Sequence, residues 1–141
     1  MKIKFPKRKL KFPKKFPKEK SRSRLIKELD RIVSEKVKKL SKGRCVKCGQ
    51  VRKNAGVSHY FGRKHMGTRW SLENLDWACW GCHLYHMEKE KNPGGWYYSY
   101  MIKKLGEKKF KTLEIMAYSI TKFSRQDIQL LINFYENKAR F

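Results

Sequence analysis

Residues 45–48 read Cys-Val-Lys-Cys and residues 79–83 read Cys-Trp-Gly-Cys-His, and these two stretches decide the fold. Two Cys-x-x-Cys pairs supply four thiols, which is the complete ligand set of a closed tetrahedral zinc site. Zinc ribbons usually separate their pairs by about 15–20 residues, whereas the insert here runs over residues 49–78. The insert contains polar residues that a structural zinc does not require. The sequence therefore predicts a zinc-bound module with a second task built into its insert.

The chain carries a large excess of positive charge. Its 141 residues include 36 Lys and Arg against 12 Asp and Glu, which gives a formal net charge of +24. A surplus of this size implies a polyanionic partner, and nucleic acid fits best because dense Lys and Arg contact phosphates and release counterions. The alternatives are a membrane-surface protein or a merely soluble basic one, but the chain has a zinc module rather than an amphipathic anchor.

The cysteine usage indicates a reducing compartment. All four cysteines belong to the two pairs, which favours metal binding over disulfides. The sequence has no apolar run long enough to span a membrane, and its basic N-terminus lacks the apolar segment of a secretory signal. We therefore expect a cytoplasmic protein without a membrane partner, or a nuclear one if its host has a nucleus.

The sequence divides into four regions. Residues 1–20 form a basic arm, residues 21–43 an N-terminal helix, residues 44–95 the zinc module, and residues 96–141 a helical region. These boundaries follow changes in charge, proline content and hydrophobic spacing. The expected fold class is α+β, with the zinc module flanked by helices.

The N-terminal arm repeats the tetrapeptide Lys-Phe-Pro-Lys, which begins at residues 4, 11 and 15. Ten of its 20 residues are Lys or Arg and one is Glu, so the arm carries +9 of the +24. Recurrent proline prevents a continuous helix and like charges repel, so we expect an extended, flexible arm. Its basic residues, including Lys7, Arg8, Lys14 and Lys15, should contact the DNA backbone. The alternative is a solvated tail without a role.

Hydrophobic spacing predicts the elements closest to the cysteines. Apolar residues at helical intervals indicate a helix over residues 21–41, with Ser23 as its N-cap. Within the zinc module we expect two short strands around His59, followed by a loop. A helix over residues 82–91 should carry the last cysteine and the residues after it.

Glycine and capping residues predict the C-terminal helices. Helices are expected over residues 96–105 and 107–118, with Gly106 between them. Ser124 and Asp127 resemble a capping box, with Asp in place of the usual Glu, and should begin the last helix.

The insert carries an ordered set of polar residues. His59 lies among strand formers, Asn74 follows it by 15 positions, and His83 follows Asn74 by 9, directly after the last cysteine. A strand, a loop and a helix converging on one cleft would form a His-Asn-His nuclease finger, the HNH or ββα-metal arrangement. Taken singly, these residues have plainer explanations: a core or surface histidine, a loop asparagine, and a histidine that packs beside the zinc or competes to bind it.

This order of residues predicts phosphodiester hydrolysis. A neutral His59 can take a proton from water near physiological pH. A single Mg²⁺ or Mn²⁺, held in part by His83, would bridge the scissile phosphate and the leaving oxygen. Asn74 would brace the loop by side-chain hydrogen bonds and orient His59.

Further residues near this set are candidates for binding. Arg63, Lys64 and Arg69 could hold phosphate oxygens. His86 and Glu90 would share a helix face with His83 and could complete the metal site, although they could equally face solvent. We expect the aromatic residues to form core rather than a base-stacking platform: Trp70, Trp77, Trp80, Trp96, Tyr97, Tyr98 and Tyr100.

From about residue 26 onward the chain resembles the NinG/Rap recombination proteins of lambda-like phages. The resemblance rests on Cys45-Val46-Lys47-Cys48-Gly49, His59-Tyr60, Arg69 with Asn74, Cys79-x-x-Cys82, and the segment from Tyr100 to Gly106. It departs from that family at His83, where NinG-like proteins usually carry Asn. It departs from many HNH enzymes at Ser58, where they place Asp or His.

The resemblance implies a structure-specific, Mg²⁺-dependent DNA endonuclease that acts on branched recombination intermediates such as Holliday junctions or displacement loops. Cutting two strands symmetrically would favour a homodimer. Two alternatives stay open: a non-catalytic zinc ribbon that binds nucleic acid, and a sequence-specific HNH endonuclease of the restriction or homing kind.

Overall fold

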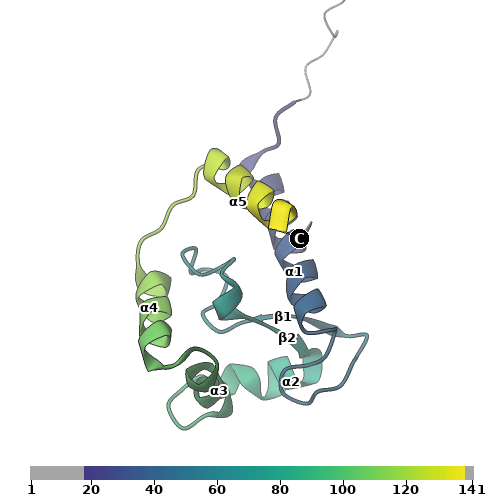
Figure 1. The fold of residues 1–141 in the computed structure, drawn as a ribbon, viewed down its shortest axis with the longest axis vertical. Helices are drawn as coiled ribbons and strands as arrows, with labels where there is room; N and C mark the ends of the chain where they lie inside the picture. The colour runs from purple at the N-terminus through teal and green to yellow at the C-terminus, as the bar shows by residue number, and fades with distance from the viewer. Residues whose placement is uncertain (1–17, 139–141) are drawn as a thin grey trace, which may run out of the picture.

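The computed structural model describes residues 18–138 and has an α+β fold, in which a small two-stranded sheet lies between two groups of helices (Figure 1). The predicted N-terminal arm falls almost entirely outside the described residues. Lys7, Arg8, Lys14 and Lys15 therefore lie outside them as well.

The sheet is an antiparallel pair, β1 (Ala55–His59) and β2 (Leu75–Cys79). Ala55 pairs with Cys79 at one end and His59 with Leu75 at the other. His59 ends its strand as predicted, but the expectation of two strands around His59 is wrong, because the second strand follows the loop. That strand is buried along its whole length and forms the centre of the fold.

One core joins the sheet to the first and last helices. Helix α1 (Arg22–Leu40) buries one apolar stripe and packs against α5 (Arg125–Lys138). The N-cap is Ser21, which accepts a hydrogen bond from the backbone of Arg24, and not Ser23 as predicted. The buried residues of this core are Leu25, Leu29, Val33, Val37, Trp70, Leu75, Trp77, Ile128, Ile132 and Tyr135.

A second core joins the sheet to α3 (Trp96–Leu105) and α4 (Glu107–Tyr118). Both helices have the predicted bounds, and Gly106 between them has a φ of +78°, a conformation that favours glycine. The buried residues here are Cys45, Tyr60, Phe61, Ala78, Cys79, Met87, Tyr97, Met101, Phe110, Leu113 and Ala117. Leu75 and Trp77 of β2 thus belong to the first core, whereas Ala78 and Cys79 belong to the second.

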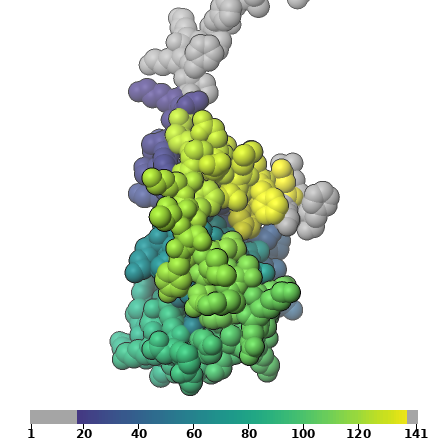
Figure 2. All heavy atoms as spheres, turned by 90° about the vertical axis from the view of Figure 1, so that its left-hand side faces the viewer, coloured from purple at the N-terminus to yellow at the C-terminus, as the bar shows by residue number. Residues whose placement is uncertain are grey.

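The predicted capping box of the last helix is present. The Ser124 amide donates to Asp127 Oδ2 at 2.7 Å, and the Asp127 amide donates to Ser124 Oγ at 3.1 Å. Figure 2 shows how α4, the connection after it and α5 follow one another along a single face of the molecule.

The expected helix over residues 82–91 is broken. Helix α2 (Trp80–Tyr85) ends early, and a 3-10 turn, η2 (Met87–Lys89), follows it. His86 between them has φ −120° and ψ −67°, which is not helical. The break turns Met87 into the core, where it is completely buried.

No helix of residues 18–138 is both long and apolar enough to cross a membrane.

Candidate functional site

The four cysteines form one cluster. Cys45 and Cys48 lie in the loop before β1, Cys79 ends β2, and Cys82 lies in α2, yet their sulfur atoms are all within 4.8 Å of one another. Zn–S bonds of about 2.3 Å place tetrahedral sulfurs roughly 3.8 Å apart, and Cys48 Sγ and Cys79 Sγ are 3.8 Å apart. That separation is far beyond an S–S bond of about 2.05 Å. The cluster fits a zinc ion.

The environments of two of these thiols, Cys45 and Cys82, differ in their effect on ionisation. Burial opposes ionisation of Cys45, but backbone amides, those of Cys48 and Cys79 first, outweigh it and lower its pKa to about 7. Burial and hydrogen bonds with the neighbouring thiols raise the pKa of Cys82 to about 12. The Cys82 thiol therefore needs a nearby cation to ionise at neutral pH, as a zinc ligand must.

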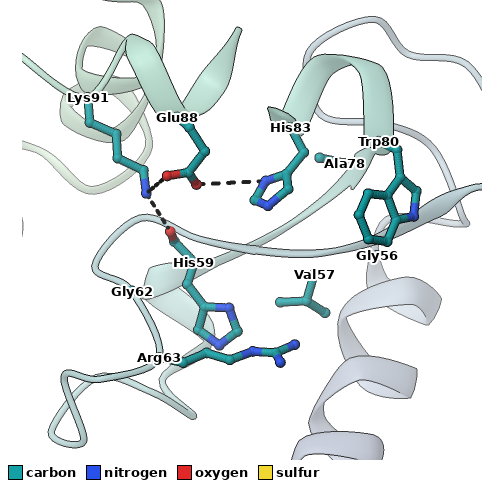
Figure 3. A pocket seen from close by; sticks show the side chains of 10 residues that line it. All are labelled: Gly56, Val57, His59, Gly62, Arg63, Ala78, Trp80, His83, Glu88 and Lys91. Atoms are coloured by element: carbon teal, nitrogen blue, oxygen red, sulfur yellow. Dashed lines mark hydrogen bonds and ion pairs between the residues drawn. The ribbon is translucent and has the colours of Figure 1, made fainter. Parts of the chain in front are cut away.

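A second site lies beside the cluster, in a cavity of about 390 Å³. His59 comes to it from the end of β1 and His83 from α2, so two residues that the sequence singled out line one cavity (Figure 3). The full lining is Gly56, Val57, His59, Gly62, Arg63, Ala78, Trp80, His83, Glu88 and Lys91.

The His59 ring is neutral and held in one orientation. Its Nε2 lies 3.1 Å from the carbonyl oxygen of Arg69, which can only accept, so Nε2 carries the proton and Nδ1 keeps a lone pair. Burial, with the nearby Arg63 charge, lowers the pKa of His59 to about 4. A second contact fixes the main chain, because Lys91 Nζ donates to the His59 carbonyl at 3.0 Å.

Helix α1 holds the loop that carries the Arg69 carbonyl. Asp30 Oδ2 accepts from Arg69 Nη2 at 2.7 Å, and Asp30 Oδ1 accepts from Arg69 Nε at 3.1 Å and from Trp70 Nε1 at 2.8 Å. Burial opposes ionisation of Asp30, but the Arg69 and Trp70 hydrogen bonds outweigh it and lower the pKa of Asp30. The guanidinium of Arg69 is thus engaged with Asp30, and its predicted phosphate contact stays a prediction.

Asn74 closes the same loop from inside. Its side chain is completely buried; Oδ1 accepts from the Phe61 amide at 2.8 Å, and Nδ2 donates to the carbonyls of Phe61 at 2.9 Å and Thr68 at 3.1 Å. These are bracing hydrogen bonds of the kind that the sequence led us to expect. They hold both ends of the segment that follows His59.

His83 makes polar contacts through Nδ1. This atom lies 3.0 Å from Ser58 Oγ and 3.9 Å from Glu88 Oε1, while Glu88 Oε2 accepts from Lys91 Nζ at 2.9 Å (Figure 3). Burial lowers the pKa of His83, although the Glu88 carboxylate acts in the opposite direction. A carboxylate and an imidazole thus lie side by side in the cavity, and these are groups that bind divalent cations.

The family was tested by comparison of the sequence with family models. The model described as Bacteriophage Lambda NinG protein matches residues 2–141. The chain belongs to the NinG family. A search of curated proteins and a search of solved structures gave no match.

In this NinG protein the two residues that the sequence offered as possible further metal ligands, His86 and Glu90, do not line the cavity of His59 and His83. His86 lines a different cavity, next to the cysteine cluster, and Glu90 forms an ion pair with Lys47. The cause is the break after α2, because it removes the continuous helix that would have aligned these side chains. The same break brings Glu88 to the cavity, a position that helical spacing from His83 does not indicate.

Some of the other residues in and beside the cavity of the NinG protein were predicted from the sequence, and others were not. Arg63 lines the cavity with an exposed side chain, and Lys64 beside it is exposed too. Trp80 was expected in the core but is 55% exposed at the cavity. Lys91 was not singled out, and the sequence offers no signal for it, because its partners come from β1 and η2.

Proposed function

We propose that this NinG protein is a metal-dependent DNA endonuclease of the HNH or ββα-metal kind, which cuts branched recombination intermediates such as Holliday junctions and displacement loops. The observation that carries the proposal is the cavity that His59 and His83 share, beside a cysteine cluster that fits zinc. The strand, loop and helix that bear the two histidines follow the order that a His-Asn-His finger requires.

The donors in the cavity suit a hard divalent cation. Glu88 supplies carboxylate oxygens next to the imidazole of His83, and Mg²⁺ commonly takes one or two carboxylates while water and substrate phosphates complete its shell. Mn²⁺ accepts imidazole more readily. A bound Mg²⁺ or Mn²⁺ would supply charge stabilisation for the phosphate and the leaving oxygen.

His59 is the group that we assign to proton abstraction. Its Nδ1 takes a proton from water while Nε2–H stays on the Arg69 carbonyl. The water oxygen then bonds to phosphorus as the bond from phosphorus to the 3′ oxygen breaks, and the 3′ oxygen takes a proton from a solvent water, which leaves 5′-phosphate and 3′-hydroxyl ends. A pKa of about 4 keeps the ring neutral, with the Nδ1 lone pair free, at physiological pH.

Basic residues account for DNA binding in this proposal. Arg63 is exposed at the cavity that His59 lines, and Lys64 follows it in sequence and is exposed too, so both side chains can contact phosphate oxygens. The net charge of +24 supplies the wider attraction. The preference for branched DNA rests on the family resemblance, and a homodimer would follow from the need to cut two strands.

The test is Mg²⁺-dependent cleavage of a four-way junction against a linear duplex of matching sequence. We expect the zinc-loaded protein to cut the junction, His59→Ala to bind it without cutting, and His86→Ala to cut like the unmodified protein, because His86 lies outside the cavity. Cleavage by His59→Ala would refute the assigned role. Tight binding without any cleavage would favour the non-catalytic zinc module, and equal cutting of the duplex at one site would favour a sequence-specific enzyme.

A further inference from the structure

A buried chain of hydrogen bonds runs from the cavity into the second core. His83 Nδ1 lies 3.0 Å from Ser58 Oγ, Ser58 Oγ lies 3.2 Å from Tyr97 Oη, and Tyr97 Oη donates to Asp76 Oδ2 at 3.4 Å. Ser58 and Tyr97 are completely buried, and Asp76 is 6% exposed. Ser58 and Asp76 pair directly across the sheet, so their side chains lie on the same face of it.

The carboxylate at the far end fixes the direction of every bond in this chain. Asp76 pairs with Lys104 and can only accept; its Oδ1 accepts from Lys104 Nζ at 3.0 Å and from Tyr100 Oη at 2.9 Å. The single hydroxyl proton of Tyr97 is donated to Asp76, so Tyr97 Oη must accept from the Ser58 hydroxyl. Because the Ser58 proton is donated to Tyr97, Ser58 Oγ must accept from His83 Nδ1–H.

We infer that Asp76, acting through Tyr97 and Ser58, keeps the proton of neutral His83 on Nδ1 and so leaves the Nε2 lone pair for a metal ion in the cavity. Asp76 is a positioning residue, because it touches neither substrate nor metal. A hydrogen bond on the second ring nitrogen commonly fixes the tautomer of metal-binding histidines. The assignment of the proton stands on this chain alone, whereas its use in metal binding rests on the proposed function.

Asp76→Asn tests the direction of the chain with little change of shape. The amide oxygen of the variant stays with Lys104 and Tyr100, which need an acceptor, and its NH₂ group then faces Tyr97 and donates to it. Tyr97 and Ser58 must reverse, and the proton of His83 must move to Nε2. The readout is the pair of imidazole ¹⁵N chemical shifts of His83 in the zinc-loaded, Mg²⁺-free protein at neutral pH, which distinguish the two tautomers.

We expect the Nδ1–H form in the unmodified protein and the Nε2–H form in Asp76→Asn. Tyr100→Phe is the matched control: it removes a hydroxyl from the same carboxylate without reversing the chain, and it should keep Nδ1–H. Tyr97→Phe interrupts the chain while keeping the ring, and should give a mixture of tautomers. An Nε2–H form in the unmodified protein, or an unchanged Nδ1–H form in Asp76→Asn, would overturn the inference. Should Asp76→Asn not fold, a pure Nδ1–H form in Tyr97→Phe would overturn it instead.

Binding of Mn²⁺ alone, titrated by its electron paramagnetic resonance signal, gives a second readout. Loss of an outer hydrogen-bond partner of a metal ligand typically costs about 10–100-fold in affinity, and we expect a loss of that size in Asp76→Asn and none in Tyr100→Phe. Junction cleavage separates the two hypotheses. If the tautomers are as expected but the protein never cuts DNA, the proposed function is wrong and this inference stands. If the protein cuts DNA but Asp76→Asn keeps the Nδ1–H form, this inference is wrong and the proposed function stands.

Discussion

Asn74→Asp is the substitution that tests most directly what holds the site loop together. The exchange hardly changes side-chain volume, so packing stays constant and only the hydrogen bonds change. One oxygen can still accept from the Phe61 amide, but the other now faces the carbonyls of Phe61 and Thr68, to which the asparagine donated. Two buried carbonyls lose their donor and meet a negative charge.

The magnitude follows from those two contacts. An unsatisfied buried polar group costs about 1–3 kcal/mol, so the free energy of unfolding should fall by roughly 2–6 kcal/mol at pH 7. Protonation of the new carboxyl restores one donor, so its pKa in the folded state is raised. A raised folded pKa means that the variant regains stability as pH falls and loses it as pH rises through that pKa. The deficit relative to the unmodified protein should therefore shrink between pH 7 and pH 5.

Equilibrium urea unfolding, followed by tryptophan fluorescence, measures this deficit. Both proteins must be compared at one fixed concentration of free zinc, since a ligand that binds only the folded state shifts the midpoint. Asn133→Asp on the exposed side of α5 introduces the same charge without buried partners, and should stay within about 0.5 kcal/mol of the unmodified protein. A deficit below about 1 kcal/mol for Asn74→Asp at pH 7 would refute the argument that this asparagine braces the loop.

Three further outcomes follow from the site. Because burial and Arg63 lower the pKa of His59 to about 4, junction cleavage at saturating metal should show no titration of this base between pH 5.5 and 8; a midpoint near 6.5, the ordinary value for histidine, would contradict the assignment. Glu88→Gln should weaken Mn²⁺ binding and let high Mn²⁺ restore cleavage, whereas Glu90→Gln should behave like the unmodified protein; equal effects would show that Glu88 is not a ligand. Chelation of zinc, or Cys79→Ser, should abolish cooperative unfolding of the module, as measured by loss of near-ultraviolet circular dichroism; an unchanged spectrum would remove zinc from the fold.

Local signals in the sequence were enough to predict most helices and the cluster of four cysteines. The bounds of α3 and α4 follow from hydrophobic spacing and Gly106, and the start of α5 from a capping box that needs only Ser124 and Asp127. The spacing of the two Cys-x-x-Cys pairs likewise predicted the cysteine cluster. All of these depend on residues that are close in sequence or on a ligand set that leaves few alternatives.

What the sequence did not reveal depends on distant partners. Nothing near Arg69 in the sequence indicates a partner, but Asp30 of α1, 39 positions away, binds its guanidinium. Glu88 reaches the cavity only because Met87 turns into the core and breaks the helix before it. The role of Ser58 depends on Asp76, which lies opposite it across the sheet. Such pairings are set by tertiary packing, which periodicity cannot describe.

The short pairing of β1 with β2 makes the whole site sensitive to strand slippage. A two-stranded ribbon is at best marginally stable in water, and a shift by one residue would exchange the faces of every side chain in it. His59 would then point where Ser58 points now, and the cavity would lose its base while the core gained an unpaired imidazole. Cys79, at one end of the ribbon, belongs to the cysteine cluster. At the other end, Asn74 accepts a hydrogen bond from the Phe61 amide. A zinc ion in this cluster would therefore select one alignment of the strands, so a metal outside the cavity would decide whether the residues proposed for hydrolysis come together.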